Sequence, residues 1–256
     1  MEATPSESDA PASRLRATAN ALYHLTAVGF FLYLFVYYWT AEGEPGLLAL
    51  ALVPVTFVLH TLDEMRKGEL YPRLPVTAST VIGAVYIVAS FAVAVYMFVE
   101  YEQIGTVRAG VWNATDLAMG ALMAALIMEY TRRRHMPLFV LNIMLIVYAV
   151  YGSAVPGMFN HPGLTWERIV TAMSVEMSTG VFSNLPQLAL TLIGSFILVL
   201  AVLRAFGCVD SILRASKRVA VRSPHALPQS AVFGSMAVGT VSGSGAANAI
   251  TVGSAL

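Results

Sequence analysis

Long apolar stretches alternate with short polar segments along most of this chain. A helix needs roughly 20 mostly apolar residues to cross the hydrocarbon core of a bilayer. Stretches of that kind lie at about residues 20–41, 46–62, 76–99, 113–130, 137–155 and 184–206. The second is short and contains Pro54, so we expect it to be kinked there. The pattern predicts an all-α integral membrane protein with about six transmembrane helices.

Two connecting segments carry apolar residues on one helical face and polar or basic residues on the other. They are residues 165–178 and 210–222. A helix of this kind suits the level of the lipid headgroups, and it equally suits a cap packed on the protein's own helices. Both interpretations are consistent with the pattern.

The C-terminal region combines a short apolar run with a break rich in glycine and serine. Residues 231–241 are apolar but too few to cross a bilayer, and the break at 242–245 reads Ser-Gly-Ser-Gly before a second run of small residues. The pattern predicts a re-entrant hairpin or a broken helix. Such breaks are tolerated at membrane depth where protein or a cavity solvates the freed backbone, and in transporters substrates bind there.

The spacing of the segments also divides the chain into three parts. Residues 1–18 are polar and acidic and lack the order of a signal peptide, so we expect a disordered tail. Residues 19–135 form a unit of four predicted spans with short loops. Residues 136–256 have longer loops, amphipathic segments and half-spans, which predicts a second part of different architecture.

Composition supports a membrane protein and excludes several other classes. Hydrophobic residues make up 57% of the chain and charged residues 12%, whereas about a quarter of a soluble domain is charged. A net charge of zero argues against a nucleic-acid-binding protein. The single cysteine, Cys208, excludes an internal disulfide and a cysteine cluster for a metal. Because no nucleophile–base pair or metal-ligand motif is recognisable, we expect no enzyme and no organic cofactor.

The basic residues fall almost entirely on one side of the predicted spans. Of the 15 lysines and arginines, all but Arg108 and Arg168 lie in the N-terminal tail, in the loops after the second and fourth spans, or at the end of the sixth span and after it. The positive-inside rule therefore places the N-terminus and the segment after the sixth span in the cytoplasm.

Two acidic residues and two histidines in the predicted spans are candidates for chemistry. Asp116 lies near the start of the fourth span, where the helix dipole favours an acid, so we expect a structural role. Glu129 is followed three and four residues later by arginines, which favours a local salt bridge over a proton relay. His24 and His60 could meet between helices, as polar packing.

The glycine- and serine-rich break has suitable atoms for a transport site. If a second half-helix begins directly after Ser244, this residue is a suitable N-cap, and the free N–H groups suit a substrate carboxylate. The unwound carbonyls, with the hydroxyls of Ser242 and Ser244, offer oxygen ligands for a small cation, and Asn248 on the same helix face offers another. The alternative is a helix-packing seam, since Gly239 and Gly243 have small-xxx-small spacing.

Three groups of residues form recognisable motifs. They are Met128-Glu129-Tyr130-Thr131-Arg132-Arg133 with Pro137-Leu138; Tyr148, Tyr151, Gly152, Pro156, Gly157, His161, Pro162 and Gly163; and, as the most specific, the stretch from Ala231 to Asn248. These motifs resemble the membrane component of tripartite ATP-independent periplasmic (TRAP) transporters. More narrowly, the chain is similar to the fused permeases of the TAXI subgroup, in which a four-helix small subunit precedes the large subunit. It departs from the family at 223–226, where Ser-Pro-His-Ala stands in place of a Gly-Gly-Pro-Ala type turn.

The resemblance implies a multi-pass permease of the inner membrane. It implies a sodium-driven secondary transporter that receives carboxylate-type solutes from a periplasmic solute-binding protein and carries them by an elevator-like motion against a fixed scaffold. Residues 19–135 would correspond to the small-subunit scaffold, and residues 136–256 to the N-terminal part of the large-subunit transport domain. The hairpin-tip positions carried over by motif are Ser242, Gly243, Ser244 and Asn248.

The family's large subunit also continues with further helices, including a second, inverted hairpin, beyond the position of Leu256. We therefore expect either a separate polypeptide that supplies the remaining part of the large permease subunit or a truncated product. An alternative function is that of a non-transporting membrane scaffold or assembly subunit, in which the Gly/Ser segment is a packing seam.

Overall fold

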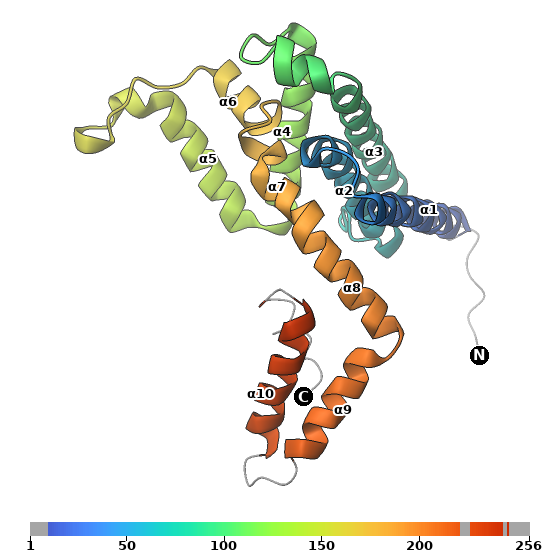
Figure 1. The fold of residues 1–256 in the computed structure, drawn as a ribbon. Coiled ribbons are helices and arrows are strands. Elements are labelled where there is room, and N and C mark those ends of the chain that lie inside the picture. The colour runs from blue at the N-terminus through green and yellow to red at the C-terminus, as the bar shows by residue number, and fades with distance from the viewer. Residues whose placement is uncertain (1–9, 221–225, 243–244, 246–256) are drawn as a thin grey trace. The chain divides into compact units, whose positions relative to one another are not determined.

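The computed structural model describes residues 10–220, 226–242 and 245, and within these ranges the chain forms helices and no strands. The α-helices are α1 (Ala10–Thr40), α2 (Pro45–Lys67), α3 (Val76–Val99), α4 (Ala114–Arg134), α5 (Met136–Tyr151), α6 (Trp166–Ser174), α7 (Asn184–Leu188), α8 (Gly194–Ala205), α9 (Cys208–Ala220) and α10 (Ala226–Ser242) (Figure 1). Short 3-10 or π-helical turns lie at Gln103–Val107, Gly152–Ala154, Gly157–Phe159, Gly180–Phe182 and Ala189–Ile193. The prediction of an all-α protein is confirmed.

Contacts divide the chain into two compact units. Unit 1 comprises Met1–Gln187 and unit 2 comprises Leu188–Leu256. The helices α1 to α6 belong to unit 1, and α8 to α10 belong to unit 2.

Five helical segments in the described part of the chain are long and apolar enough to cross a membrane. They are Ser13–Thr40, Pro45–Lys67, Val76–Val99, Met136–Ala154 and Gly180–Ala205. The predicted count of six is therefore not reached. The remaining candidate forms as α4, a helix of 21 residues, but Asp116, Glu129 and the arginines of its last turn lower its apolar character.

The first helix begins earlier than the sequence pattern indicated. α1 starts at Ala10, so residues 10–18, expected to belong to a disordered tail, are helical, while residues 1–9 lie outside the described residues. The extra turns contain Ala12, Leu15, Arg16 and Ala17, all of them residues with high helix propensity. Local propensity therefore extends the helix beyond its apolar part.

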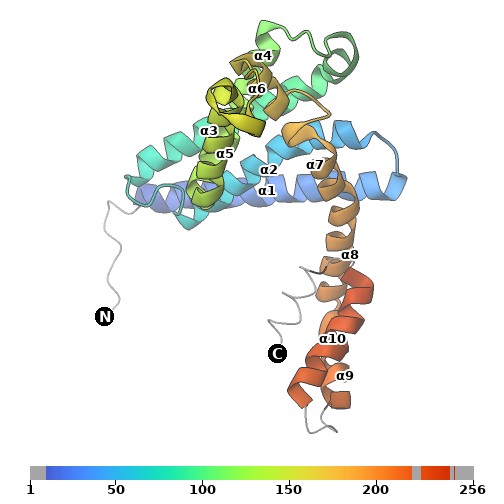
Figure 2. The ribbon, with the colours of Figure 1, turned by 90° about the vertical axis from the view of Figure 1, so that its left-hand side faces the viewer.

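The central helix of unit 1 is α2. It packs on both α1 and α3, and Figure 2 shows α1 and α2 lying along each other. Half of its apolar window is buried, whereas 6% is buried in the windows of α1 and of α5. The side chains of Leu50, Val58, Met97 and Met123, from α2, α3 and α4, are almost fully buried. Apolar side chains of α1 and α5 face outward instead, which suits helices that contact lipid, because lipid tails are as apolar as these side chains.

One end of unit 1 gathers basic residues from three helices. Arg66, near the end of α2, donates to Asn20 of α1 through Nη1 at 3.3 Å. Glu64 of α2 forms ion pairs with Arg133 and Arg134 at the end of α4. The N-terminal part of α1 and the C-terminal ends of α2 and α4 therefore lie together, as the distribution of basic residues along the chain predicted.

The first amphipathic segment forms a cap on unit 1. α6 packs on α4, and Ser174 Oγ donates to the backbone oxygen of Gly120 at 2.6 Å. A Cβ on Gly120 would collide with the side chain of Val175, so this close approach requires glycine. The cap interpretation therefore fits this segment, whose helix ends at Ser174 rather than at residue 178.

Candidate functional site

The predicted hairpin-tip residues lie at and after the end of α10. Ser242 is the last residue of this 17-residue helix, and Gly243, Ser244 and Asn248 lie outside the described residues. The apolar part of the helix, Ala231–Thr240, forms as predicted and is shorter than a membrane span. The structure thus describes the helix that leads to the predicted site.

Within unit 2, α10 is packed against two other helices. It contacts α9 along its length and also contacts α8, and both views show α9 and α10 side by side (Figures 1 and 2). Among the side chains of α10 that the structure describes, Gly234 and Val238 are the buried positions. They stand four residues apart, so one face of α10 meets its neighbours. The second amphipathic segment is α9, which packs on α10 and α8.

The second motif group spans the end of α5 and the loop that follows it, which contains two 3-10 turns. Tyr148 donates its hydroxyl to the backbone oxygen of Phe159 at 2.7 Å, and its ring packs edge-on against His161. The imidazole of His161 occupies the space that a Cβ on Gly152 would need, and its Nδ1 accepts a hydrogen bond from Gly163 N at 3.1 Å. Gly163 itself has φ 84° and approaches the backbone of α5. These motif residues therefore have a structural function, which is to hold this loop in one conformation.

Unit 1 contains a cluster of charged residues that joins α2 to α4. Glu64 of α2 is only 2% exposed. Its carboxylate accepts hydrogen bonds from Arg133 and from Arg134, the latter at 2.8 Å from Nε, and it lies 3.1 Å from His60 Nε2. An unpaired carboxylate at such a position would be strongly disfavoured, so the two arginines are required for its burial. We call these residues, with Glu129, the Glu64 cluster.

Glu129 extends the Glu64 cluster to α3 and to the loop before it. Arg132 donates two hydrogen bonds to its carboxylate, at 2.8 and 2.7 Å, so the predicted local salt bridge is confirmed. Tyr71 also donates to Glu129, and its hydroxyl lies 2.9 Å from that of Tyr86 on α3. Burial, together with the hydrogen bond to Glu129, raises the pKa of the Tyr71 hydroxyl, which keeps it a neutral donor.

Asp116, at the other end of α4, is fully buried and has several partners. It forms a capping box with Asn113, in which Asp116 N donates to Asn113 Oδ1 at 2.7 Å and Asn113 N donates to Asp116 Oδ2 at 3.0 Å. Tyr96 donates its hydroxyl to Asp116 at 2.8 Å, and Arg108 lies 3.5 Å away. The expected structural role is therefore confirmed, and Asp116 and Glu129 do not form a pair.

The candidate histidines do not form a site together. The ring of His24 packs edge-on against Tyr23, whereas His60 contacts Glu64 and the ring of Tyr130. In the described part of the chain, no group of three or more His, Cys, Asp or Glu side chains is placed to hold a metal ion.

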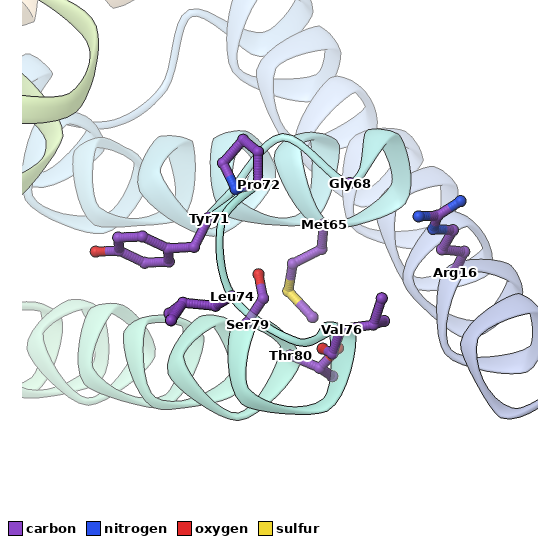
Figure 3. Close-up of a pocket in the computed structure, with 9 residues that line it drawn as sticks. All are labelled: Arg16, Met65, Gly68, Tyr71, Pro72, Leu74, Val76, Ser79 and Thr80. Atoms are coloured by element: carbon purple, nitrogen blue, oxygen red, sulfur yellow. The ribbon is translucent and has the colours of Figure 1, made fainter. Parts of the chain in front are cut away.

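A cavity of about 100 Å³ lies where the end of α2, the following loop and the start of α3 meet the N-terminal part of α1 (Figure 3). Figure 3 shows Arg16 at one side of it and Met65, Leu74 and Val76 around its apolar part. Gly68 has φ 73°, and a Cβ there would lie 3.1 Å from the Arg16 guanidinium. Arg16 is the one charged residue in the lining, and Tyr71, Ser79 and Thr80 add hydroxyl groups, so this lining offers no set of groups for acid–base catalysis.

The Glu64 cluster was not predicted from the sequence. Glu64 follows the predicted second span and precedes Arg66 and Lys67, so it resembled a solvated loop residue. A signal was present, because Val58, Thr61 and Glu64 continue one buried helical face at intervals of three residues. The run of arginines at 132–134 likewise contains more positive charge than Glu129 alone can balance.

Comparison with known proteins gives one match. The sequence model of the family described as "Tripartite ATP-independent periplasmic transporter, DctM component" matches residues 119–256, which is more than half of the chain. The matched part includes the end of α4, the loop after α5 and all of α10. A search of curated proteins and a search of solved structures each find no match.

Proposed function

Since this chain belongs to the DctM family of TRAP transporter permease components, we propose that it serves as the membrane permease part of a sodium-coupled secondary transporter for organic acids. In this proposal the solute arrives on a periplasmic binding protein, and the remaining part of the large permease subunit completes the transport path. In this proposal the N-terminal four-helix part corresponds to the small subunit of a fused permease of the TAXI type. It resides in the inner membrane with its N-terminus in the cytoplasm.

The observation that carries this proposal is the position of α10. This helix lies in the family-matched region, has an apolar part too short to cross a bilayer, and runs directly into the Ser-Gly-Ser-Gly segment. The last carbonyls of a helix have no partner within the helix. At membrane depth these groups need protein, water or an ion, and transporters use such helix ends as ligand sites.

The proposed ion ligands are the side-chain oxygens of Ser242, Ser244 and Asn248, together with backbone carbonyls around Gly243. Sodium is a hard cation that is bound by oxygen, and these residue types offer neutral oxygens without a competing positive charge. The N–H groups that follow Ser244 would then face the carboxylate of the solute.

The Glu64 cluster supports a scaffold function for residues 19–135. Transport against a fixed frame requires helices that keep their mutual position while another part moves. Glu64 joins α2 to α4 through two arginines, and Tyr71 with Tyr86 joins α3 to the same cluster. We propose that these contacts hold the scaffold. Residues 136–256 would be the N-terminal part of the large-subunit transport domain, of which α5 and α6 pack on α4 within unit 1.

Sodium-dependent uptake of an organic acid tests the proposal. It is measured in proteoliposomes that contain this chain, the rest of the permease and the solute-binding protein. Asn248→Ala removes one proposed oxygen ligand, which should weaken sodium binding by about 1–3 kcal/mol, or roughly 5- to 150-fold. The sodium concentration for half-maximal uptake should rise accordingly.

Ser254→Ala is the matched control, because it removes an oxygen from the same small-residue run outside the proposed ligand set. It should leave the sodium dependence unchanged. Equal sodium dependence of both variants, with both inserted and stable, would refute the ion site. The assembly-subunit alternative predicts instead that Gly243→Leu weakens assembly and that no variant alters a response to sodium.

A further inference from the structure

Three polar atoms of the Glu64 cluster and its neighbourhood are buried without a hydrogen-bond partner in the described structure. They are His60 Nε2, Ser90 Oγ and Arg133 Nε. Two of these atoms lie near a carboxylate: Arg133 Nε is 3.5 Å from Glu129, and His60 Nε2 is 3.1 Å from Glu64. Buried polar groups in folded proteins are almost always satisfied, so three of them in one place require an explanation.

All three residues line the same cavity between α2, α3 and α4. The cavity is also lined by Phe57, Leu126 and Glu129, and the volume open to the centre of a water molecule is about 10 Å³. That volume is close to the minimum that accommodates a single water molecule. A fourth buried atom of this kind, Arg108 Nε, lies near Asp116 at the start of α4, and Arg108 does not line the cavity.

Charge and size together restrict what the cavity can hold. The charged side chains that line the cavity are Glu129 and Arg133, one of each sign, so the lining has no excess charge that would favour an ion. The volume is too small for an anion with its own coordination shell. A water molecule has two hydrogens and two lone pairs. It can therefore form hydrogen bonds with the N–H donor of Arg133, the hydroxyl of Ser90 and either tautomer of the His60 imidazole.

We propose that this cavity is a binding site for one ordered water molecule. The water accepts a hydrogen bond from Arg133 Nε–H, donates one to Ser90 Oγ and completes the pairing of His60 Nε2. Ser90 is 1% exposed and lies on α3, so the water connects α3 to the ionic contacts between α2 and α4. This inference depends on unit 1 alone and is independent of the proposed transport site.

An electron cryomicroscopy structure of the chain in lipid nanodiscs, at a resolution that shows ordered water, tests the site directly. One density peak should lie within hydrogen-bond distance of Ser90 Oγ, Arg133 Nε and His60 Nε2. A collapsed cavity, or a peak that contacts none of these atoms, would overturn the proposal.

The melting temperatures of two Ser90 variants distinguish a hydrated cavity from a dry one, because the more stable variant differs between the two cases. Ser90→Val fills the cavity and expels the water, which leaves Arg133 Nε unpaired, whereas Ser90→Ala leaves room for the water. If the cavity is hydrated, Ser90→Val should melt below Ser90→Ala by roughly 2–4 °C. If the cavity is dry, the larger side chain improves packing and Ser90→Val melts higher, which would disprove the proposal.

The intrinsic difference between valine and alanine in this helix needs its own control. Val88 lies on α3 and is 68% exposed, so Val88→Ala measures that difference away from the cavity. Its effect on the melting temperature is subtracted before the two Ser90 variants are compared.

Discussion

Two buried carboxylates near opposite ends of α4 are satisfied in different ways. Asp116 takes part in a capping box with Asn113, three residues earlier in the chain. Glu64 has its arginine partners 69 and 70 residues later, at the opposite end of α4. Asp116 therefore mainly fixes the start of one helix, whereas Glu64 joins two helices that are distant in sequence.

The two ends of this helix bundle differ in the charged residues that surround the buried acid. Arg133 and Arg134 lie 17 and 18 residues after Asp116 on α4. That length of helix is roughly 25 Å, near the thickness of the hydrocarbon core. At the Asp116 end the acid is held by its own helix, by Tyr96 and by Arg108. At the Glu64 end several basic residues collect, and the acid is surrounded by them. We expect the two ends to face opposite sides of the membrane.

Cysteine labelling gives the largest expected difference between the two ends, because the outcome is all or none. In a Cys208→Ser background, an impermeant thiol reagent added from the periplasm should label Glu44→Cys and Glu102→Cys. Lys67→Cys and Arg73→Cys, at exposed positions, should react only after the membrane is permeabilised. Periplasmic labelling of Lys67→Cys would contradict the arrangement, and the Cys208→Ser parent supplies the background signal.

Removal of the Glu64 carboxylate should be the most destabilising single change in unit 1. Glu64→Ala leaves Arg133 and Arg134 without their shared partner, and loss of one member of a buried pair costs about 3–5 kcal/mol. The measurement is the free energy of unfolding in mixed micelles. Glu69→Ala is the control, because Glu69 is exposed and lies 3.7 Å from Arg134. That variant should lose at most about 1 kcal/mol. Equal losses of stability in the two variants would show that the Glu64 carboxylate does not hold α2 and α4 together.

Asp116→Ala should have a smaller effect, because part of what it removes is a local cap. The variant loses the acceptor for Asn113 N and leaves the Tyr96 hydroxyl without its carboxylate, a loss of about 1–3 kcal/mol. Asp116→Asn keeps one acceptor oxygen and should be intermediate in unfolding experiments. An Asp116→Ala variant as stable as the parent would mean that the buried end of α4 tolerates the loss of its cap.

Tyr71→Phe should give the smallest effect of the series. The variant removes one hydrogen bond that the Glu129 carboxylate accepts, but Arg132 still donates two hydrogen bonds to that carboxylate. The free energy of unfolding should therefore fall by about 0.5–1.5 kcal/mol. Tyr33→Phe, at an exposed position on α1, is the matched control in the same unfolding assay. A loss as large as that of Glu64→Ala would place the centre of the cluster at Glu129 instead.

Local sequence patterns predicted much of the fold. Apolar stretches located five helices that are long and apolar enough to cross a membrane, and helical spacing located α6 and α9. The motifs at 128–138, 148–163 and 231–248 indicated the transporter family that the sequence comparison then showed. The Glu129–Arg132 bridge and the role of Asp116 were also predicted, because their main partners lie within a few residues in the chain. These features depend on helix periodicity, capping and short-range charge, all of which are encoded locally.

The tertiary structure decided which polar residues meet across helices. Nothing in the local pattern of Glu64 distinguishes a solvated acid from the buried centre of a cluster. Only the packing of α2 against α3, with α4 beside α3, brings Arg133 and Arg134 to Glu64 and Tyr71 to Glu129. The same packing decided that α6 caps α4 at Gly120. Contacts between residues distant in the chain depend on helix rotation and register, and a single sequence leaves these undetermined because many registers bury similar apolar area.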